Sequence, residues 1–437
     1  MYRFVVDERV PCRLRQLPPP QAPRVALAES HRPVYLAVPT AAVPFIRGYR
    51  LGAPAGAWFV EDLRLVRQLA EEGVVPAGLD AAGRAELEAL NAAGLLSPDP
   101  ARRQALRLCD QGERYRHLYE PDLCSWFALS PISLELDLTN LCNQRCVHCC
   151  RASSPQVRVD LELSTREWLR LLDEAAEIGV DEVSFLGGEP TLHPHLIELA
   201  YFARKRGIHR LNLATNALSL SEELVEVAAA LFTCIQVSLH GVRAETHEAI
   251  VRHPGAFERV VHNVSRLKAN GARIVLAYTV MASNRGELPA MLAVARGLQV
   301  DGIRFIPLAD EGRGHQLPSL GMTDYGEVGE FIREAREGAP GLSVSSGGFP
   351  TGEETPAGAL FYGCAAGLSK LYLNAQGRAG GCSLLGAERI PGRSRPLIEI
   401  WHDEDMRRTR RRVDCDCPFV SQCAGGCLSV PKHGRAI

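Results

Sequence analysis

Three cysteine residues in one short loop have the types and the spacing to hold a metal cofactor. Cys142, Cys146 and Cys149 lie in the run Leu-Cys-Asn-Gln-Arg-Cys-Val-His-Cys, with the spacing C-x3-C-x2-C. A loop that presents three thiolates can bind three corners of a cubane iron–sulfur cluster, which leaves the fourth iron open to another ligand. A zinc knuckle is the alternative, although zinc usually requires four ligands close together.

A second group of cysteines lies near the carboxyl terminus. The run Tyr-Leu-Asn-Ala-Gln-Gly-Arg at 372–378 predicts a β-hairpin that turns between Asn374 and Gly377. This hairpin would bring together the cysteines on either side of it. Four cysteines at such dense spacing could hold a structural zinc, but beside an iron–sulfur loop iron is favoured. The group consists of Cys364, Cys382, Cys415, Cys417, Cys423 and Cys427.

The elements that position the first loop follow from alternating apolar and amphipathic segments. A period-two pattern at 133–138 predicts a strand that runs directly into the loop, and Ser164 or Thr165 is expected to cap the next helix. Such alternation predicts an α/β fold with a parallel sheet, here an open or partial (βα)6 barrel, because two further repeats for eight strands are not evident. Further strands are predicted at 182–186, 210–214, 234–239, 273–280 and 302–306, and helices at 165–178, 194–206, 221–231, 256–270 and 287–298.

Polar residues and glycines follow the predicted strands, at the sheet edge where parallel α/β proteins place their chemistry. The run Gly187-Gly188-Glu189-Pro190 follows the second strand. Its glycines allow the backbone to approach a ligand, and its carboxylate could bind an ammonium group, although alone the run would indicate only a turn. The other residues at strand ends are Thr215, Asn216, Ser238, His240 and Asn284.

Together, these motifs resemble the radical S-adenosylmethionine (SAM) superfamily over roughly residues 132–310. The resemblance implies that the three cysteines bind a [4Fe–4S] cluster whose open iron is chelated by SAM. It also implies that Glu189 binds the SAM amino group and that Ser238 contacts the SAM ribose or carboxylate. The implied cofactor-binding residues are Gly187, Gly188, Glu189, Pro190, Thr215, Asn216, Ser238, Arg252 and Asn284.

Several positions differ from the usual motifs of that superfamily. Thr215-Asn216-Ala217 resembles a Thr-Asn-Gly element with Ala217 in place of glycine. His240 stands where aspartate is usual, and His148 stands where an aromatic residue usually precedes the last cysteine. Because that aromatic residue contacts adenine mainly through its backbone, the resemblance implies that histidine is tolerated there.

The carboxyl-terminal cysteines resemble the SPASM extension of peptide-modifying radical SAM enzymes. Asp414 occupies the place of one cysteine of that pattern, and no cysteine follows Cys427. Since two cubanes need eight thiolates and only six are present, we expect one complete auxiliary cluster or two with an open or unusual ligand. The ligand assignment of the family implies that one cluster is bound by Cys364, Cys382 and Cys427. The other cluster would be bound by Cys415, Cys417 and Cys423.

Three domains are predicted, at 1–125, 130–320 and 321–437, which suits a chain of 437 residues. In the first, strands within 34–46 and helices at 61–72 and 81–93 form a small α+β pattern. It is similar to the winged-helix element that binds leader peptides, and a capping domain of other purpose is the alternative.

The charge and hydropathy of the sequence limit the expected binding partners and the expected location of the protein in the cell. The net charge of −2 gives no reason to expect a nucleic-acid or membrane partner. Neither a secretion signal nor an apolar stretch of about 20 residues is present, which predicts a cytoplasmic protein.

The resemblance implies an enzyme that cleaves SAM reductively, with flavodoxin or ferredoxin as the reductant. The resulting 5′-deoxyadenosyl radical would abstract hydrogen from a peptide, such as a precursor peptide with a leader in ribosomal natural product maturation. The outcome would be a crosslink, an epimerisation or an excision. A small-molecule substrate such as a tetrapyrrole or an alcohol is the alternative. An iron–sulfur electron carrier or a zinc protein is the non-enzyme alternative, against which the Gly-Gly-Glu-Pro run speaks.

Overall fold

The computed structural model describes residues 2–6, 25–30, 32–39, 57–60, 126–128, 130–208, 210–349, 351, 366–367, 370–384 and 390–410. The helices expected at 61–72 and 81–93 lie outside these residues, as do five carboxyl-terminal cysteines: Cys364, Cys415, Cys417, Cys423 and Cys427. The predictions that concern them therefore stay predictions.

The amino-terminal strands form a five-stranded sheet in the order β4-β2-β3-β1-β5. Strands β1 and β3 run parallel, whereas the other neighbours are antiparallel. Because β5 pairs with β1, the sheet includes residues just beyond the predicted boundary at 125. The strands are β1 (Tyr2–Val6), β2 (Val25–Ser30), β3 (Arg32–Pro39), β4 (Ala57–Val60) and β5 (Trp126–Ala128).

The remaining strands form a ten-stranded sheet in the order β12-β11-β10-β9-β8-β7-β6-β13-β14-β15. All six predicted strands are present, as β6 to β11, and they pair in parallel. The sheet is larger than predicted, because β12 adds a parallel strand beside β11 and β13 adds one beside β6. The strands are β6 (Ser133–Asp137), β7 (Glu182–Leu186), β8 (Arg210–Thr215), β9 (Cys234–Ser238), β10 (Ile274–Val280), β11 (Gly302–Pro307), β12 (Ser343–Ser346), β13 (Lys370–Leu373), β14 (Arg378–Gly380) and β15 (Ile390–Pro391).

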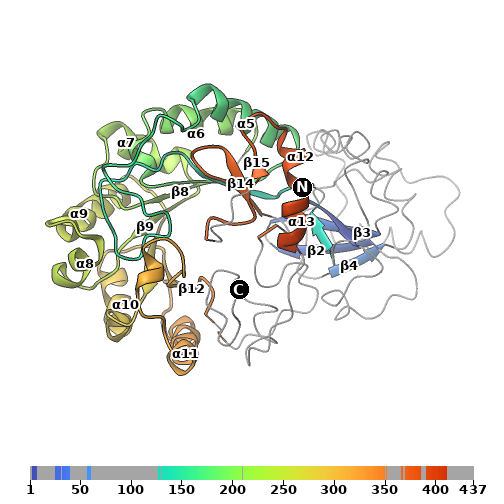
Figure 1. Cartoon of the computed structure of the whole chain (residues 1–437). Coiled ribbons are helices and arrows are strands. Elements are labelled where there is room, and N and C mark those ends of the chain that lie inside the picture. The colour runs from blue at the N-terminus through green and yellow to red at the C-terminus, as the bar shows by residue number, and fades with distance from the viewer. Residues whose placement is uncertain are drawn as a thin grey trace, which may run out of the picture.

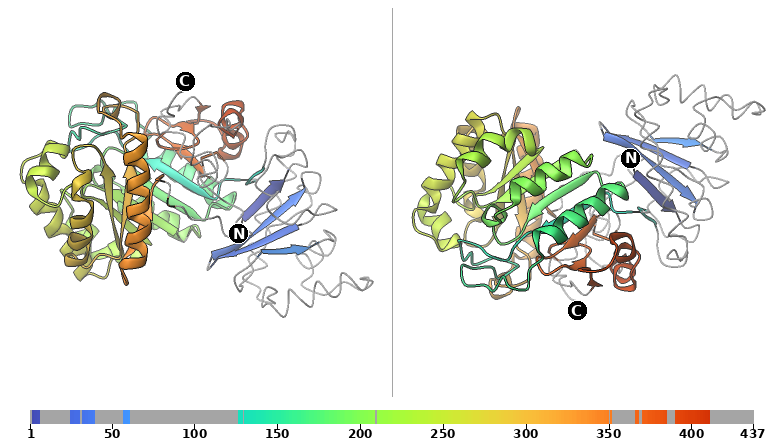
Figure 2. Two further views of the ribbon diagram at one scale, coloured as in Figure 1. Left: turned by 90° about the horizontal axis from the view of Figure 1, so that it is seen from below. Right: turned by 90° about the horizontal axis from the view of Figure 1, so that it is seen from above.

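Helices cover the outer face of the curved parallel sheet (Figures 1 and 2). The five predicted helices are present within two residues of their expected ends, whereas α8, α11, α12 and α13 were not predicted. The α-helices are α5 (Thr165–Glu177), α6 (Leu196–Lys205), α7 (Glu222–Leu231), α8 (Ala244–Val251), α9 (Ala256–Ala269), α10 (Leu288–Gly297), α11 (Met322–Gly338), α12 (Leu397–Trp401) and α13 (Glu404–Arg410). Short 3-10 helices are η5 (Pro190–Leu192), η6 (Arg285–Glu287) and η7 (Gly314–Gln316).

The strand before the cysteine loop, β6, is held in the sheet by apolar side chains that are buried on one of its faces. Leu134 and Leu136 of β6 have no exposed surface and belong to the same core as Trp168 of α5. Each fully buried leucine contributes about 1.5–3 kcal/mol to folding. Ser164 caps α5 as predicted, since its hydroxyl accepts from the Glu167 backbone N–H while the Glu167 carboxylate accepts from the Ser164 N–H at 2.7 Å.

The predicted hairpin at 372–378 is confirmed as β13 and β14. Asn374 Oδ1 accepts from the backbone N–H groups of Gln376 and Arg378 at 3.1 and 2.9 Å, and Gly377 takes the left-handed φ of 75° that this turn needs. Because β13 pairs with β6, the hairpin lies beside the strand that leads into the cysteine loop.

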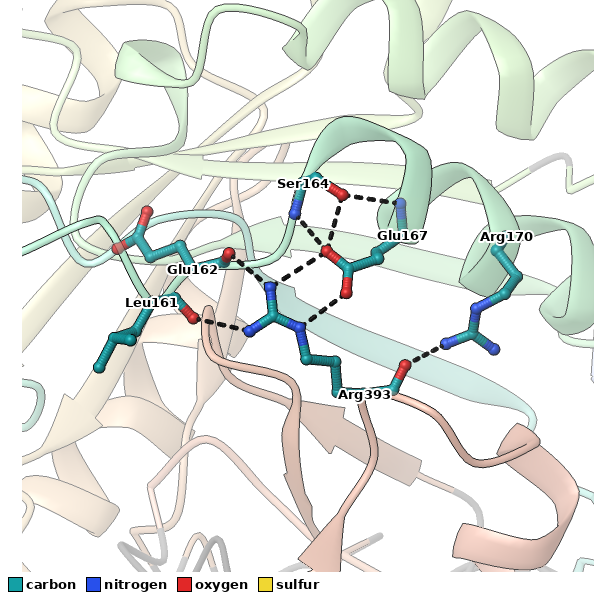
Figure 3. A network of polar contacts seen from close by, with 6 residues as sticks. All are labelled: Leu161, Glu162, Ser164, Glu167, Arg170 and Arg393. Carbon is teal, nitrogen blue, oxygen red and sulfur yellow. Dashed lines mark hydrogen bonds and ion pairs between the residues drawn. The ribbon is translucent and has the colours of Figure 1, made fainter.

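Arg393 fastens the segment after β15 to the start of α5 (Figure 3). Its guanidinium contacts the Glu167 carboxylate at 2.7 Å and donates to the carbonyls of Leu161 and Glu162. Arg170 donates in return to the Arg393 carbonyl at 2.7 Å. The carboxyl-terminal strands are thereby tied to the first helix of the parallel sheet.

Candidate functional site

The cysteine loop lies at the carboxyl end of β6, at the sheet edge that the sequence predicted. Cys142 is buried, and Cys146 and Cys149 are half-buried. Three other segments hold this loop through backbone contacts: the Gly-Gly-Glu-Pro run after β7, the end of α8 and the segment after β11.

The Gly-Gly-Glu-Pro run packs directly on the start of the cysteine loop. Gly188 N donates to the Thr139 carbonyl at 2.6 Å, and Glu189 N donates to the Leu141 carbonyl at 2.8 Å. A Cβ on Gly188 would lie 2.5 Å from the Asn140 carbonyl oxygen and still closer to that of Leu141. Only glycine fits here, because the two loops touch each other along their backbones.

Glu189 has no exposed surface, and its carboxylate joins two loops. One oxygen accepts from Thr191 N at 3.1 Å, Thr191 Oγ1 at 2.7 Å and Thr215 Oγ1 at 2.6 Å. The other accepts from Asn216 N at 2.7 Å. Burial raises the pKa of the Glu189 carboxyl above its ordinary value, and these hydrogen bonds act in the opposite direction. One carboxylate oxygen therefore keeps capacity for a further donor.

The Thr-Asn-Ala element after β8 reaches the cysteine loop through its asparagine. Asn216 Nδ2 donates to Asn143 Oδ1 at 2.7 Å and lies 3.7 Å from Cys142 Sγ. Ala217 adopts a left-handed φ of 51° and is fully buried. Such a φ favours glycine, which explains why an Ala-for-Gly difference at this position carries backbone strain.

The end of α8 supports the middle of the cysteine loop. Arg145 N donates to the Val251 carbonyl at 3.2 Å, and Val147 N donates to the Ile250 carbonyl at 2.9 Å. Arg252 follows directly as the left-handed cap of α8, with a φ of 53° and an exposed side chain. The sequence-predicted Arg252 thus lies beside the loop, but the contact to the loop comes from backbone carbonyls.

Three histidines line one side of the loop. The His148 ring meets His240 edge-on at 4.5 Å, and His240 stacks on His247 at 6.1 Å. Burial is the main cause that lowers the pKa of His148 to about 4, and the Arg313 charge adds to it. Burial likewise lowers the pKa of His240 and of His247, which favours the neutral form of all three rings over the charged one.

Asn284 and Ser238 lie at the same edge, with different surroundings. Asn284 is buried, donates to the carbonyls of His240 and Thr279 at 3.0 Å each, and accepts from Met281 N at 2.8 Å. These bonds use both of its amide hydrogens, so Asn284 holds the ends of β9 and β10 together. Ser238 ends β9 and is half-buried.

The segment after β11 contributes an arginine that was not predicted from the sequence. Arg313 N donates to the Cys149 carbonyl at 3.0 Å, its Nε to the Cys146 carbonyl at 2.7 Å, and its Nη2 to the Ser153 carbonyl at 2.8 Å. Its neighbours Gly312 and Gly314 allow this approach, since a Cβ on Gly312 would lie 2.6 Å from the Cys149 carbonyl oxygen. The sequence feature that could have pointed to Arg313 is the Gly-Arg-Gly run that follows a parallel strand.

The donor set of the loop fits an iron–sulfur cubane better than a single ion. Burial raises the pKa of the Cys142 thiol to about 12, with further contributions from Glu189 and Cys149. Burial and the Cys149 and Cys142 charges likewise raise that of Cys146. Three thiolates this close need positive charge to offset their repulsion. A zinc knuckle would need four ligands around one ion, whereas the C-x3-C-x2-C spacing supplies three thiolates. A cubane distributes its ligands over different irons.

A polar cluster connects the loop with the carboxyl-terminal hairpin. Arg151 Nε contacts Asp137 Oδ2 at 2.8 Å, and Tyr372 Oη donates to the same carboxylate. The Arg151 guanidinium also lies 4.5 Å above the Tyr372 ring. Cys382 follows β14 on this side of the sheet, and the next residue, Ser383, donates through its backbone to Glu135 of β6 at 3.3 Å.

Comparison with known proteins agrees with this geometry. The family model described as "Radical SAM superfamily" matches residues 136–294. An AdoMet-dependent heme synthase of Methanosarcina barkeri is 28% identical over 327 residues, which cover 68% of this chain and 91% of that protein. A PqqA peptide cyclase of Gluconobacter oxydans is 30% identical over 316 residues, which cover 68% and 85%. The crystal structure of Streptococcus suis SuiB bound to precursor peptide SuiA superposes with a TM-score of 0.62 at 16% identity, over 79% of this chain and 83% of that one.

The chain therefore belongs to the radical SAM superfamily, and it is a radical SAM enzyme. Enzymes of this superfamily use SAM and a [4Fe–4S] cluster. SPASM-type enzymes that modify peptides are among the relatives. In the part of the chain that the structure describes, no helix is both long and apolar enough to cross a membrane.

Proposed function

We propose that this protein is a peptide-modifying radical SAM enzyme of the SPASM type. Cys142, Cys146 and Cys149 would hold the [4Fe–4S] cluster. SAM bound at the open iron would supply a 5′-deoxyadenosyl radical, with flavodoxin or ferredoxin as the source of the electron. The observation that carries the proposal is the meeting of the cysteine loop, the Gly-Gly-Glu-Pro run and Asn216 at one sheet edge.

The residues around the loop would bind and orient SAM. One Glu189 oxygen accepts only from Asn216 N, and its negative charge suits the SAM ammonium. Ser238 would contact the ribose or the carboxylate. Gly187, Gly188 and Pro190 shape the binding loop, Thr215 and Asn216 hold it in place, and Arg252 and Asn284 complete the edge. The three packed histidine rings would shield this side of the site from water.

The SPASM pattern of the carboxyl-terminal cysteines favours a peptide as the substrate. Relatives named for a peptide substrate support this choice, as does a similarly folded protein solved with its precursor peptide. In this proposal the residues of 321–437 hold one or two auxiliary clusters, and 1–125 recognise the leader. The heme synthase relative, matched over 91% of its length, supports tetrapyrrole chemistry as a second candidate.

The two candidates are separated by supplying both substrates to the anaerobic, reduced enzyme with SAM. One reaction contains a candidate precursor peptide with its leader, and the other contains iron coproporphyrin. We expect 5′-deoxyadenosine together with a changed peptide mass, or deuterium gained from D2O if the reaction is an epimerisation. A peptide without its leader should react more slowly. An altered porphyrin beside an unaltered peptide would favour the second candidate.

A further inference from the structure

Arg313 is bound to the cysteine loop by backbone carbonyls alone. Its side chain spans the carbonyls of Cys146 and Ser153, and its backbone N–H reaches that of Cys149. A guanidinium usually pairs with a carboxylate when it is partly buried. Within the described parts of the chain, no carboxylate forms an ion pair with Arg313, and the nearby Asp310 is paired with His315.

Among the described residues, no carboxylate therefore offsets the positive charge of Arg313, and its guanidinium lies against the backbone of the cysteine loop. Its Nε lies 2.7 Å from the Cys146 carbonyl oxygen and its Nη2 lies 2.8 Å from that of Ser153, which fixes the charge beside this part of the loop. Partial burial keeps this charge from being fully screened by solvent and salt. No other described arginine or lysine donates to the carbonyls of this loop, apart from the loop's own residues.

We infer that Arg313 is a positioning residue that also raises the reduction potential of the cluster held by Cys142, Cys146 and Cys149. The inference rests on that cluster being bound by these cysteines. One-electron reduction adds one negative charge to a site that already carries three thiolates. A fixed cation beside Cys146 stabilises the reduced form more than the oxidised form, because the Coulomb energy scales with the charge it faces. Reduction by a physiological donor therefore becomes easier.

Comparing Arg313→Gln with Arg313→Lys in the full-length protein separates the effect of the Arg313 charge from the effect of its hydrogen bonds to the loop carbonyls. Gln removes the charge and keeps one donor, whereas Lys keeps the charge and loses the fork that spans two carbonyls. Arg285→Gln is the matched control, since Arg285 lies after β10 at the same edge but is ion-paired with Asp324. Iron content is measured first, and the midpoint potential then follows from the electron paramagnetic resonance signal that changes when SAM is added.

For Arg313→Gln we expect the equilibrium constant for cluster reduction to fall about tenfold, which for a one-electron couple is about 59 mV. Arg313→Lys should stay within about threefold of the native protein, and Arg285→Gln should match it. If Arg313→Gln fails to retain iron, a native-like potential in Arg313→Lys still supports the assignment. An unchanged potential in Arg313→Gln, an equally lowered one in Arg313→Lys, or loss of iron in both would overturn it.

Discussion

A single buried carboxylate, Glu189, connects the chemistry of the site with its architecture. It accepts four hydrogen bonds, from Thr191, Thr215 and Asn216, and it lies under a backbone that contacts Leu141. A turn without a ligand would not require a charged group at zero exposure, because burying a carboxylate is costly unless its bonds compensate. Glu189 thus holds the surrounding loops in position and also places a negative charge in the site.

Replacement of Glu189 by Gln should lower SAM affinity roughly ten- to hundredfold, with the cluster iron retained. Hydrogen bonds to charged groups contribute about 1.5–3 kcal/mol each, and 1.4 kcal/mol corresponds to a factor of ten. Equilibrium binding of SAM and iron analysis check this result. Glu287→Gln serves as the control, since Glu287 also accepts from a backbone N–H and a threonine hydroxyl, at Val242 and Thr246. Unchanged affinity in Glu189→Gln would show that this carboxylate does not face SAM.

Replacement of Gly188 by Ala should separate the two loops and lower the iron held by the core loop, which is about four irons in the native protein, to less than half. The added Cβ would lie within 2.5 Å of the Asn140 carbonyl oxygen, a backbone atom that cannot yield as a flexible side chain can. Gly286→Ala is the matched control, because nothing lies within 4 Å of a Cβ at Gly286. The number of irons bound per protein after anaerobic reconstitution tests this prediction. If Gly188→Ala binds as much iron as the native protein, the close contact between the two loops is refuted.

The residue types in the sequence could indicate the chemistry of the site, but they could not indicate the hydrogen-bond partners of every residue in it. The cysteine spacing and the Gly-Gly-Glu-Pro run predicted where the site lies, because parallel strands end at one edge. The bonds of Asn284 to His240 and Thr279 could not be predicted, since any polar residue at a strand end can face either ligand or backbone. Arg313 was missed for the same reason: its contacts join positions 167 residues apart.

At the scale of elements, strong periodicity made the strands β6 to β11 and the helices between them predictable. The strand β12 escaped prediction because its sequence, Ser-Val-Ser-Ser, has one apolar residue and lies at the sheet edge. The helix α8 was missed because it is short and follows a loop directly. The pairing of β13 with β6 is a contact between distant segments, on which local patterns carry no information.

The link between α5 and the carboxyl-terminal strands should loosen when Arg393 is replaced by Ala. We expect faster amide hydrogen exchange at 161–167 and 390–397, with a global stability loss below about 1 kcal/mol because the pair with Glu167 is largely exposed. Arg158→Ala is the control, since Arg158 pairs with Asp160 on the same loop without touching the carboxyl-terminal segment. Equal exchange in both variants would contradict the fastening role.

The same link should respond to acid in a defined direction. The Arg393 hydrogen bond lowers the pKa of the Glu167 carboxyl to about 2 from its ordinary 4.5. A depressed carboxyl pKa contributes stability above pH 4.5, and this contribution is lost as the pH falls toward 2. The difference in exchange between native protein and Arg393→Ala should therefore shrink over that interval.

At the scale of the whole molecule, one sheet connects the cysteine loop with Cys382, the carboxyl-terminal cysteine that lies within the described residues. Strand β13 brings Lys370 to Glu135 at 2.7 Å and Tyr372 to Asp137, so the hairpin that precedes Cys382 lies against the strand that precedes Cys142. The sequence predicted the hairpin but not this adjacency.

The carboxyl-terminal cysteines should hold iron independently of the core loop. With Cys142, Cys146 and Cys149 replaced by Ala, anaerobic protein should retain about four irons if one auxiliary cubane forms and about eight if two form. We expect eight, because closely spaced thiolates are poorly placed to remain without a ligand. Iron and zinc analysis tests this, and zinc in place of iron, or no metal, would contradict it.

The production of 5′-deoxyadenosine from SAM tests the central claim most directly. Under anaerobic reducing conditions the native protein should form it, and the variant with Ala at Cys142, Cys146 and Cys149 should form none. The control is Cys234→Ala, which replaces a half-buried cysteine of β9 outside both groups and should keep native activity. If SAM cleavage persists in the triple variant, the assignment of the radical chemistry to this loop is wrong.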